Sequence, residues 1–232
     1  MTDAPRPRGD AVVTAALDLF ATQGYEQTSV DQIARAAGVS RSTFFRVYGG
    51  KDDVVFADHE VAIATLRAVL EQPQESPWRA VCDAALAAFE HFGGDLGFAR
   101  RRYRVVRGIP ALRDREIVAV FRYERLFAEH LRSRLPDLDP VDAVAFGAAT
   151  TAVHNHVLRR LIRGDAVSRA TLEAALDDLL HRFGVHPGGE PAAADDLVVA
   201  VFPRRMPLAE VTRRLRADLP GTPSPGAIDA RA

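Results

Sequence analysis

The chain has 232 residues and a formal net charge of −1, so no overall basic field points to nucleic acid or to an anionic membrane. Hydrophobic residues make up 47% and charged residues 26%, which is ordinary for a globular protein with a buried core. Cys82 is the single cysteine, which excludes an internal disulfide and a multi-cysteine zinc site. No apolar run approaches about 18 residues and the N-terminus is polar, so we expect a cytoplasmic protein without a membrane segment.

The first part of the chain has the pattern of four helices. We expect them at 9–23, between Ser29 and Gly38, at 41–47, and from Asp52 to about Glu71. Thr28 or Ser29 can cap the second helix, and Gly38 ends it in a left-handed conformation. Ser40 caps the third helix.

After residue 75 the spacing of apolar residues again predicts helices, punctuated by proline and glycine. We expect them at about 76–92, 96–107, 110–134, 140–163 and 168–183. The apolar run 197–202 fits a strand or one helical turn, and 207–219 fits an amphipathic helix. The fold class is therefore all-α.

The second and third predicted helices are joined by a tight glycine turn, which is the helix-turn-helix pattern. Residues 32–51 contain four cations and no Asp or Glu. A surface that meets DNA phosphates gains affinity from each cation and loses it with each carboxylate. The alternative is the solvated face of a small helical bundle, and the coincidence of charge, helix length and turn favours DNA.

Segment 17–55, LDLFATQGYEQTSVDQIARAAGVSRSTFFRVYGGKDDVV, resembles the DNA-binding domain of the tetracycline-repressor (TetR) family. The matching pieces are LF...GY..TSV, IA..AGVS..T.F, and a lysine followed by acids and an apolar pair. The resemblance covers roughly residues 9–55, and the remainder matches in architecture only. It implies an N-terminal three-helix DNA-binding domain and a C-terminal helical domain for ligand binding and dimerisation.

The domain organisation expected from this resemblance has four parts. They are a flexible arm (1–8), the helix-turn-helix domain (9–55), the helical effector-binding and dimerisation domain (56–186), and an additional, partly disordered C-terminal extension (187–232). The extension does not belong to the usual family plan, and its segment 195–219, which includes the amphipathic stretch 207–219, has no assigned role.

The resemblance also assigns the DNA contacts. The residues it implies are Thr28 and Lys51 for phosphate, and Arg41, Ser42, Thr43 and Arg46 for bases and phosphates. Lys51 is the chain's single lysine, and a compact ammonium suits one phosphate oxygen. The family usually has Tyr where this chain has Phe45, so that position is expected to make apolar contact with a thymine methyl or a sugar.

A single short recognition helix has limited affinity, so such proteins dimerise on palindromic double-stranded operators. The resemblance implies a homodimer built by the last two long helices, at 140–163 and 168–183. Small residues at 145–153 would permit close helix approach. The alternative is that both helices belong to the core of one subunit.

Aromatic residues concentrate between 78 and 146, where the family encloses an effector pocket. The expected ligand contacts are Phe89, Arg100, Tyr103, Arg104, Phe121, Phe127 and His154. The arginines suggest an anionic effector, acyl-CoA-like in one weak resemblance, although arginines along a helix edge are more often solvated. His154 and His156 lie about 200° apart on a helix, so they do not chelate one metal ion.

Together these features predict a ligand-responsive homodimeric transcription regulator, most often a repressor that a small molecule releases from its operator. An enzyme is disfavoured because the sequence lacks a phosphate loop, a nucleophile elbow, a metal cluster and a convincing acid pair; no catalytic residue, metal or cofactor is expected. The remaining alternative is a ligand-blind or architectural helix-turn-helix protein, which would lack an effector cavity.

Overall fold

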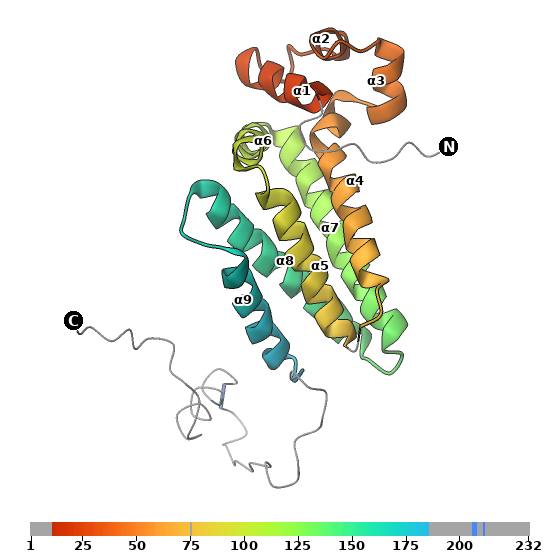
Figure 1. Cartoon of the computed structure of the whole chain (residues 1–232), viewed down its shortest axis with the longest axis vertical. Helices are drawn as coiled ribbons and strands as arrows, with labels where there is room; N and C mark the ends of the chain where they lie inside the picture. Colours follow the sequence, from red (N-terminus) through yellow and green to blue (C-terminus); the bar gives the residue numbers. More distant parts are fainter. Residues whose placement is uncertain (1–10, 75, 186–205, 208–210, 212–232) are drawn as a thin grey trace, which may run out of the picture. The chain divides into compact units, whose positions relative to one another are not determined.

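The computed structural model describes residues 11–74, 76–185, 206–207 and 211 (Figure 1). Over these residues the chain forms α-helices and no strand, which confirms the all-α prediction. The helices are α1 (Ala11–Thr22), α2 (Val30–Ala36), α3 (Arg41–Tyr48), α4 (Lys51–Leu70), α5 (Pro77–Gly93), α6 (Leu96–Gly108), α7 (Pro110–Arg134), α8 (Pro140–Arg163) and α9 (Arg169–Arg182).

The chain divides into two units, 1–189 and 190–232, and the nine helices named above all lie in the first. The predicted strand or turn at 197–202 lies outside the described residues, as does most of the predicted helix at 207–219. No helix in the described ranges is long and apolar enough to cross a membrane.

Helices α1, α2 and α3 share a core because each presents one apolar face inward. Leu17, Ile33 and Phe44 are fully buried there. Gly38 has φ of +69°, the left-handed conformation that lets the chain turn between α2 and α3. The same core includes Val54 and Val55 of α4, together with Phe98, Val105, Val106 and Leu112 from α6 and the start of α7. The helix-turn-helix unit therefore packs directly on α4, α6 and α7.

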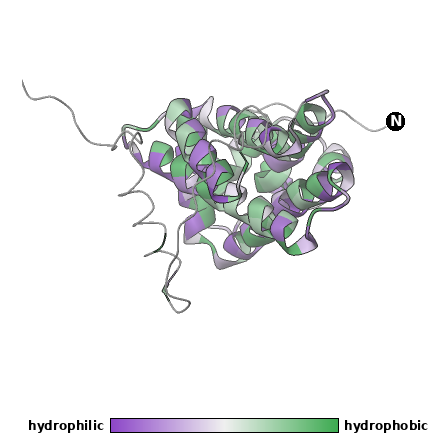
Figure 2. Cartoon of the chain, turned by 90° about the horizontal axis from the view of Figure 1, so that it is seen from below, coloured by the Kyte–Doolittle hydropathy of each residue, from purple (hydrophilic) through white to green (hydrophobic). Residues whose placement is uncertain are grey.

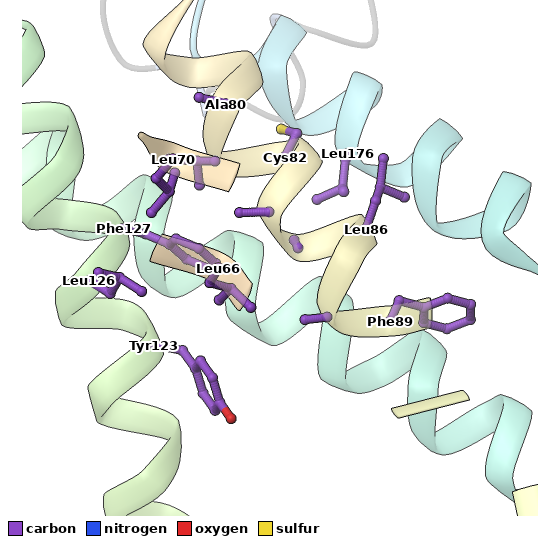
Figure 3. Packing of buried hydrophobic residues seen from close by; sticks show 14 of the residues in the cluster. Leu66, Leu70, Ala80, Cys82, Leu86, Phe89, Tyr123, Leu126, Phe127 and Leu176 are labelled. Atoms are coloured by element: carbon purple, nitrogen blue, oxygen red, sulfur yellow. The ribbon is translucent and has the colours of Figure 1, made fainter. Parts of the chain in front are cut away.

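A second core forms between α4, α5, α7, α8 and α9 (Figure 3). Its aromatic part includes Trp78 and Phe146, whose rings meet edge to face with centroids 4.8 Å apart. Hydrophobic and hydrophilic residues are mixed along each helix, as expected where each helix buries one side only (Figure 2).

Helices α7 and α8 approach closely at Gly147. A Cβ atom at this position would lie 2.9 Å from the backbone oxygen of Glu124, so only glycine fits without a shift of the backbone. The small residues at 145–153 are thus divided. Gly147, Thr150 and Thr151 are buried against the rest of the chain, whereas Ala145 and Ala152 are exposed. The leucines of α9 at 172, 176, 179 and 180 are buried within the subunit.

Candidate nucleic-acid interface and effector cavity

The outward face of α3 is formed by Arg41, Ser42, Phe45 and Arg46, which are all exposed. Phe45 is 41% exposed, which is unusual for a large apolar side chain and leaves its ring available for contact. The helix is set by Ser40, whose hydroxyl accepts the backbone N–H of Thr43 at 3.1 Å. Ser40 Oγ also lies 2.9 Å from the hydroxyl oxygens of Ser42 and Thr43, so both are tied to the cap.

The two arginines of this face differ in their surroundings. Arg41 forms an ion pair with Asp31 at 3.0 Å, and its guanidinium lies 5.4 Å from the Phe45 ring centroid. Both members of the pair are more than half exposed, so the pair is weak and water-accessible. Arg46 has no hydrogen-bond or ion-pair partner within the described part of the chain. Within the described residues, Arg46 is therefore an unpaired cation on this face, and Arg41 is a cation paired with the exposed Asp31.

The resemblance implies a phosphate contact for Thr28, whose side chain is engaged within the protein in this structure. Its side chain is 2% exposed, and its hydroxyl donates to Gly24 O at 2.7 Å. Ser29 is the residue that caps α2, through a reciprocal capping box with Gln32. Ser29 is exposed, whereas Thr28 is buried and its hydrogen bond to Gly24 stabilises the turn after α1. The exposed hydroxyl at the start of α2 is thus that of Ser29.

Lys51 opens α4 and ties it to the turn between α1 and α2. Its ammonium donates to Tyr25 O at 2.9 Å and to Thr28 O at 3.4 Å, and it lies 3.9 Å from the Tyr25 ring centroid. An ammonium with three donors fits two carbonyls and a ring, a geometry that a planar guanidinium does not reproduce. This contact accounts for the chain's single lysine without DNA. The predicted phosphate contact would have to share the ammonium with these partners.

The acids after Lys51 connect the helix-turn-helix unit to α7. Asp53 forms an ion pair with Arg115, and Asp52 lies 3.7 Å from the same guanidinium. Asp52 also accepts a hydrogen bond from the Tyr25 hydroxyl, and burial together with this carboxylate raises the pKa of Tyr25. The start of α4 is therefore fixed on both sides, by α1–α2 and by α7.

A cavity with about 890 Å³ of unfilled space, its open mouth included, lies between α4, α5, α6, α7 and α8. Each helix contributes residues at helical spacing, such as Ala85, Ala88 and Phe92 of α5. Apolar side chains dominate its walls, including Leu66, Phe98, Val120, Phe127, Leu158 and Ile162.

A chain of polar groups crosses one wall of the cavity. Arg102 of α6 donates to the backbone oxygen of Val55 at 3.0 Å and lies 2.7 Å from His59 Nε2. His59 Nδ1 lies 2.8 Å from the Tyr123 hydroxyl of α7. Glu116 lies 3.5 Å from Arg102. Burial, assisted by the nearby Arg102 charge, lowers the pKa of His59 well below its usual value, so this histidine is neutral.

Helix α8 contributes His154 and Asn155 to the lining. His154 is 7% exposed, and its Nδ1 lies 3.2 Å from the Asn155 side-chain oxygen. Its Nε2 is buried and has no hydrogen-bond partner in the described structure. Burial lowers the pKa of His154 to about 4. The Phe92 ring neighbours both histidines, with its centroid 5.3 Å from that of His59 and 6.4 Å from that of His154.

Three of the predicted ligand contacts line the cavity, namely Tyr103, Phe127 and His154. Phe121 does not, because it is 61% exposed on the side of α7 away from Val120 and Tyr123. Phe89 is buried but also lies outside the lining, and it packs against His154 with ring centroids 6.3 Å apart. Figure 3 shows its ring directed away from Tyr123.

The two arginines predicted to contact a ligand are Arg100 and Arg104. Arg100 and Arg104 are exposed and do not line the cavity, and the side chain of Arg100 is bonded to the backbone oxygen of Ile162 at 2.9 Å. Arg102, two residues from each of them, is the α6 arginine that reaches inside. A turn of about 200° separates positions two apart, so the choice of arginine depended on the rotation of α6.

Sequence reasoning missed His59, Arg102 and Tyr123. His59 and Asp58 were visible as polar residues within the apolar stripe of α4, and that interruption is the signal that could have identified them. Arg102 and Tyr123 had no such signal, because each stands among similar residues in the sequence.

A comparison with protein families matches residues 12–57 to the bacterial regulatory proteins of the tetR family. MftR of Mycobacterium tuberculosis, whose name assigns it provisionally to mycofactocin biosynthesis, is 35% identical over 46% of this chain and 59% of its own length. The regulator TcmR of Streptomyces glaucescens is 39% identical over 32% of this chain and 34% of its own. The chain thus spans less than two thirds of these relatives.

Solved structures share the fold over most of the chain. SmeT in complex with triclosan has a TM-score of 0.57 and 16% identity, covering 82% of this chain and 98% of SmeT. The fatty acid degradation regulator FadR of Bacillus halodurans has a TM-score of 0.53 and 19% identity, and the match covers 78% of this chain and 99% of FadR. At these identities the likeness is one of fold.

Proposed function

This chain belongs to the TetR family of bacterial regulatory proteins, and we propose that it is a homodimeric DNA-binding transcription regulator. We further propose that it acts as a repressor that a small molecule releases from a palindromic operator. The observation that carries the proposal is a physical connection. Arg102 lines the cavity and at the same time bonds the backbone of α4, the helix on which the DNA-reading unit is mounted.

DNA contact is proposed for the outward face of α3. Arg41, Ser42, Phe45 and Arg46 are exposed together, and residues 32–51 contain no carboxylate. Phosphates would compete with Asp31 for Arg41, and Arg46 needs no such exchange. Thr43 and Lys51 are engaged in the protein, so we assign them a supporting role, and Ser29 replaces Thr28 as the hydroxyl that a phosphate can reach.

The dimer is proposed to form through α8 and α9, as the family resemblance implies. Val141, Val144, Ala145 and Ala152 make the exposed side of α8 small and apolar, which suits close packing against a second copy. Two recognition helices would then read half-sites about 34–36 Å apart, or a multiple of that distance.

The domain division that we propose keeps residues 9–55 as the DNA-binding unit and 56–186 as the effector and dimerisation unit. The boundary falls inside α4, which runs through both. A rigid helix shared by two units transmits movement, whereas a flexible linker would not. The arm 1–8 and the extension 187–232 lie outside this account.

Release by a ligand is proposed as a population shift. A ligand that fills the cavity meets Arg102 and His59, and any change in their positions acts on Val55 and hence on α4. If the ligand prefers a separation of the two recognition helices that does not match the groove spacing, it lowers operator affinity. The fold neighbour SmeT was solved with a small molecule, triclosan, which supports a ligand-responsive role.

Selection of genomic fragments bound by the full-length chain tests this function. We expect enrichment of a palindrome whose half-site centres are separated by one helical turn or a multiple of it. Absence of any enriched sequence at low ionic strength would contradict the proposal. A ligand-blind architectural protein would instead bind fragments with little sequence preference and keep them when cavity ligands are added.

A further inference from the structure

Two residues that line the cavity, His154 and Tyr123, carry hydrogen-bonding capacity that their partners in the described structure do not use. Asp58 lies 2.6 Å from His91 Nε2, and Glu116 lies 3.5 Å from Arg102. Arg159 is exposed at the edge of the lining. The charges are therefore committed to one another or lie near water, and the interior contact surface is mainly hydrocarbon and aromatic.

The first unused group is Nε2 of His154. The side-chain oxygen of Asn155 can only accept a hydrogen bond, so Nδ1 of His154 carries the proton. Burial lowers the pKa of this histidine to about 4, so near neutral pH the ring holds a single proton. Nε2 then bears a lone pair and acts as an acceptor. It is buried without a partner in the described structure, which is a costly state unless something donates to it.

The second unused group is the hydroxyl proton of Tyr123. A guanidinium only donates hydrogen bonds, so Nε2 of His59 accepts from Arg102. In neutral His59 the proton is therefore on Nδ1, which donates to the Tyr123 oxygen. The O–H of Tyr123 is left to donate elsewhere. Tyr123 lines the cavity, and Figure 3 shows its hydroxyl directed away from Leu126 and Phe127.

We propose that the effector is an uncharged, largely apolar molecule with an O–H or N–H group that donates to Nε2 of His154 and an acceptor atom that receives the Tyr123 hydroxyl proton. This inference rests on the proposed role of the cavity as the effector site, and it replaces the anionic or acyl-CoA-like effector suggested by the sequence. His154 on α8 and Tyr123 on α7 thus set specificity together.

Charged effectors are disfavoured by the same contacts. A carboxylate has no hydrogen to give to Nε2 of His154, and the only arginine in the interior of the lining, Arg102, already bonds Val55, His59 and Glu116. A cation would meet carboxylates that are already paired. Moving an unpaired charge into an apolar cavity is costly, so uncharged ligands are selected.

Four probes with similar hydrocarbon chains test this assignment by titration calorimetry on the full-length protein. They are n-octanol, its isomer heptyl methyl ether, octanoate and octylammonium. The alcohol donates and accepts, whereas the ether only accepts. We expect n-octanol to bind about tenfold more tightly than the ether, since one buried hydrogen bond distinguishes them. Both ions should bind more weakly than the alcohol.

Variants assign the effect to the two residues. In His154→Leu the alcohol and the ether should bind with about equal affinity. His154→Gln keeps a hydrogen-bond acceptor, so it should retain part of the preference for the alcohol. His156→Leu is the matched control, because His156 is exposed on α8 and outside the lining, and it should keep the full preference. Tyr123→Phe should weaken both isomers by a similar factor, leaving their ratio unchanged.

The proposal would be overturned by tighter binding of octanoate than of n-octanol, by an unchanged isomer ratio in folded His154→Leu, or by no binding of any probe. Operator release is measured separately by fluorescence anisotropy. If n-octanol binds as expected without releasing DNA, the release function fails and the ligand chemistry stands. If only anions bind and release DNA, the ligand chemistry fails and the release function stands.

Discussion

Replacing His154 by leucine should remove a defined part of the acid sensitivity of this protein. Burial lowers the pKa of His154 from 6.5 to about 4, with no nearby charge among the causes. The unfolded chain therefore binds the proton more readily than the folded chain. Stability from this site is fully present above pH 6.5, declines as the pH falls toward 4, and is constant below that.

The size of the effect follows from the two pKa values. Between pH 7 and pH 5, linkage predicts a loss of about 2 kcal/mol in unfolding free energy from His154 alone. His59, whose pKa is also lowered by burial, acts in the same direction but is present in both proteins, so its contribution cancels in the comparison. His154→Leu should thus lose about 2 kcal/mol less than the wild type over this interval.

Urea denaturation at pH 7 and pH 5, followed by circular dichroism at one fixed protein concentration, measures the difference. A fixed concentration is needed because subunit association contributes to the stability of a dimer. His156→Leu is the control and should lose as much stability as the wild type, because His156 is exposed. Parallel losses in wild type and His154→Leu would refute the reasoning that His154 is buried in its neutral form.

Three further substitutions probe the contacts that position the site, each followed by urea denaturation at pH 7. Lys51→Ala should lower the free energy of unfolding by about 1–3 kcal/mol, because the carbonyl groups of Tyr25 and Thr28 lose their ammonium partner. Unchanged stability would contradict this structural role of Lys51. Gly147→Ala should cost about 1–3 kcal/mol through overpacking of α7 against α8, and a neutral result would contradict that close approach. Ser29→Ala should cost about 1 kcal/mol by removing the α2 cap, and no loss would contradict the capping box.

Much of the fold could be predicted because the helix ends have strong local signals. Ser40, Pro110, Pro140 and Gly164 each stand at a cap or a first turn, and the predicted ends agree with the observed ones to within a residue or two. The outward face of α3 was also predictable. Once Phe44 is assigned to the core, helical periodicity places its neighbours Phe45 and Arg46 outside.

The cavity could be predicted only in part, because its lining depends on how each long helix is rotated about its axis. Phe121 and Tyr123 are aromatic residues two positions apart, and packing against α4 and α8 decides that Tyr123 faces inward. The partners of Lys51 were equally hidden, since its contact with Tyr25 joins residues 26 positions apart. Such contacts form only after the helices are placed relative to one another.

The salt dependence of operator binding by the full-length chain, measured by fluorescence anisotropy on a fragment recovered by genomic selection, tests the central claim most directly. We predict that Arg46→Ala weakens binding and lowers the slope of affinity against salt by about one unit per lost phosphate contact. Arg132→Ala, at an exposed arginine near the far end of α7, should bind as the wild type does. Equal affinity and slope for all three proteins would contradict DNA recognition by the α3 face.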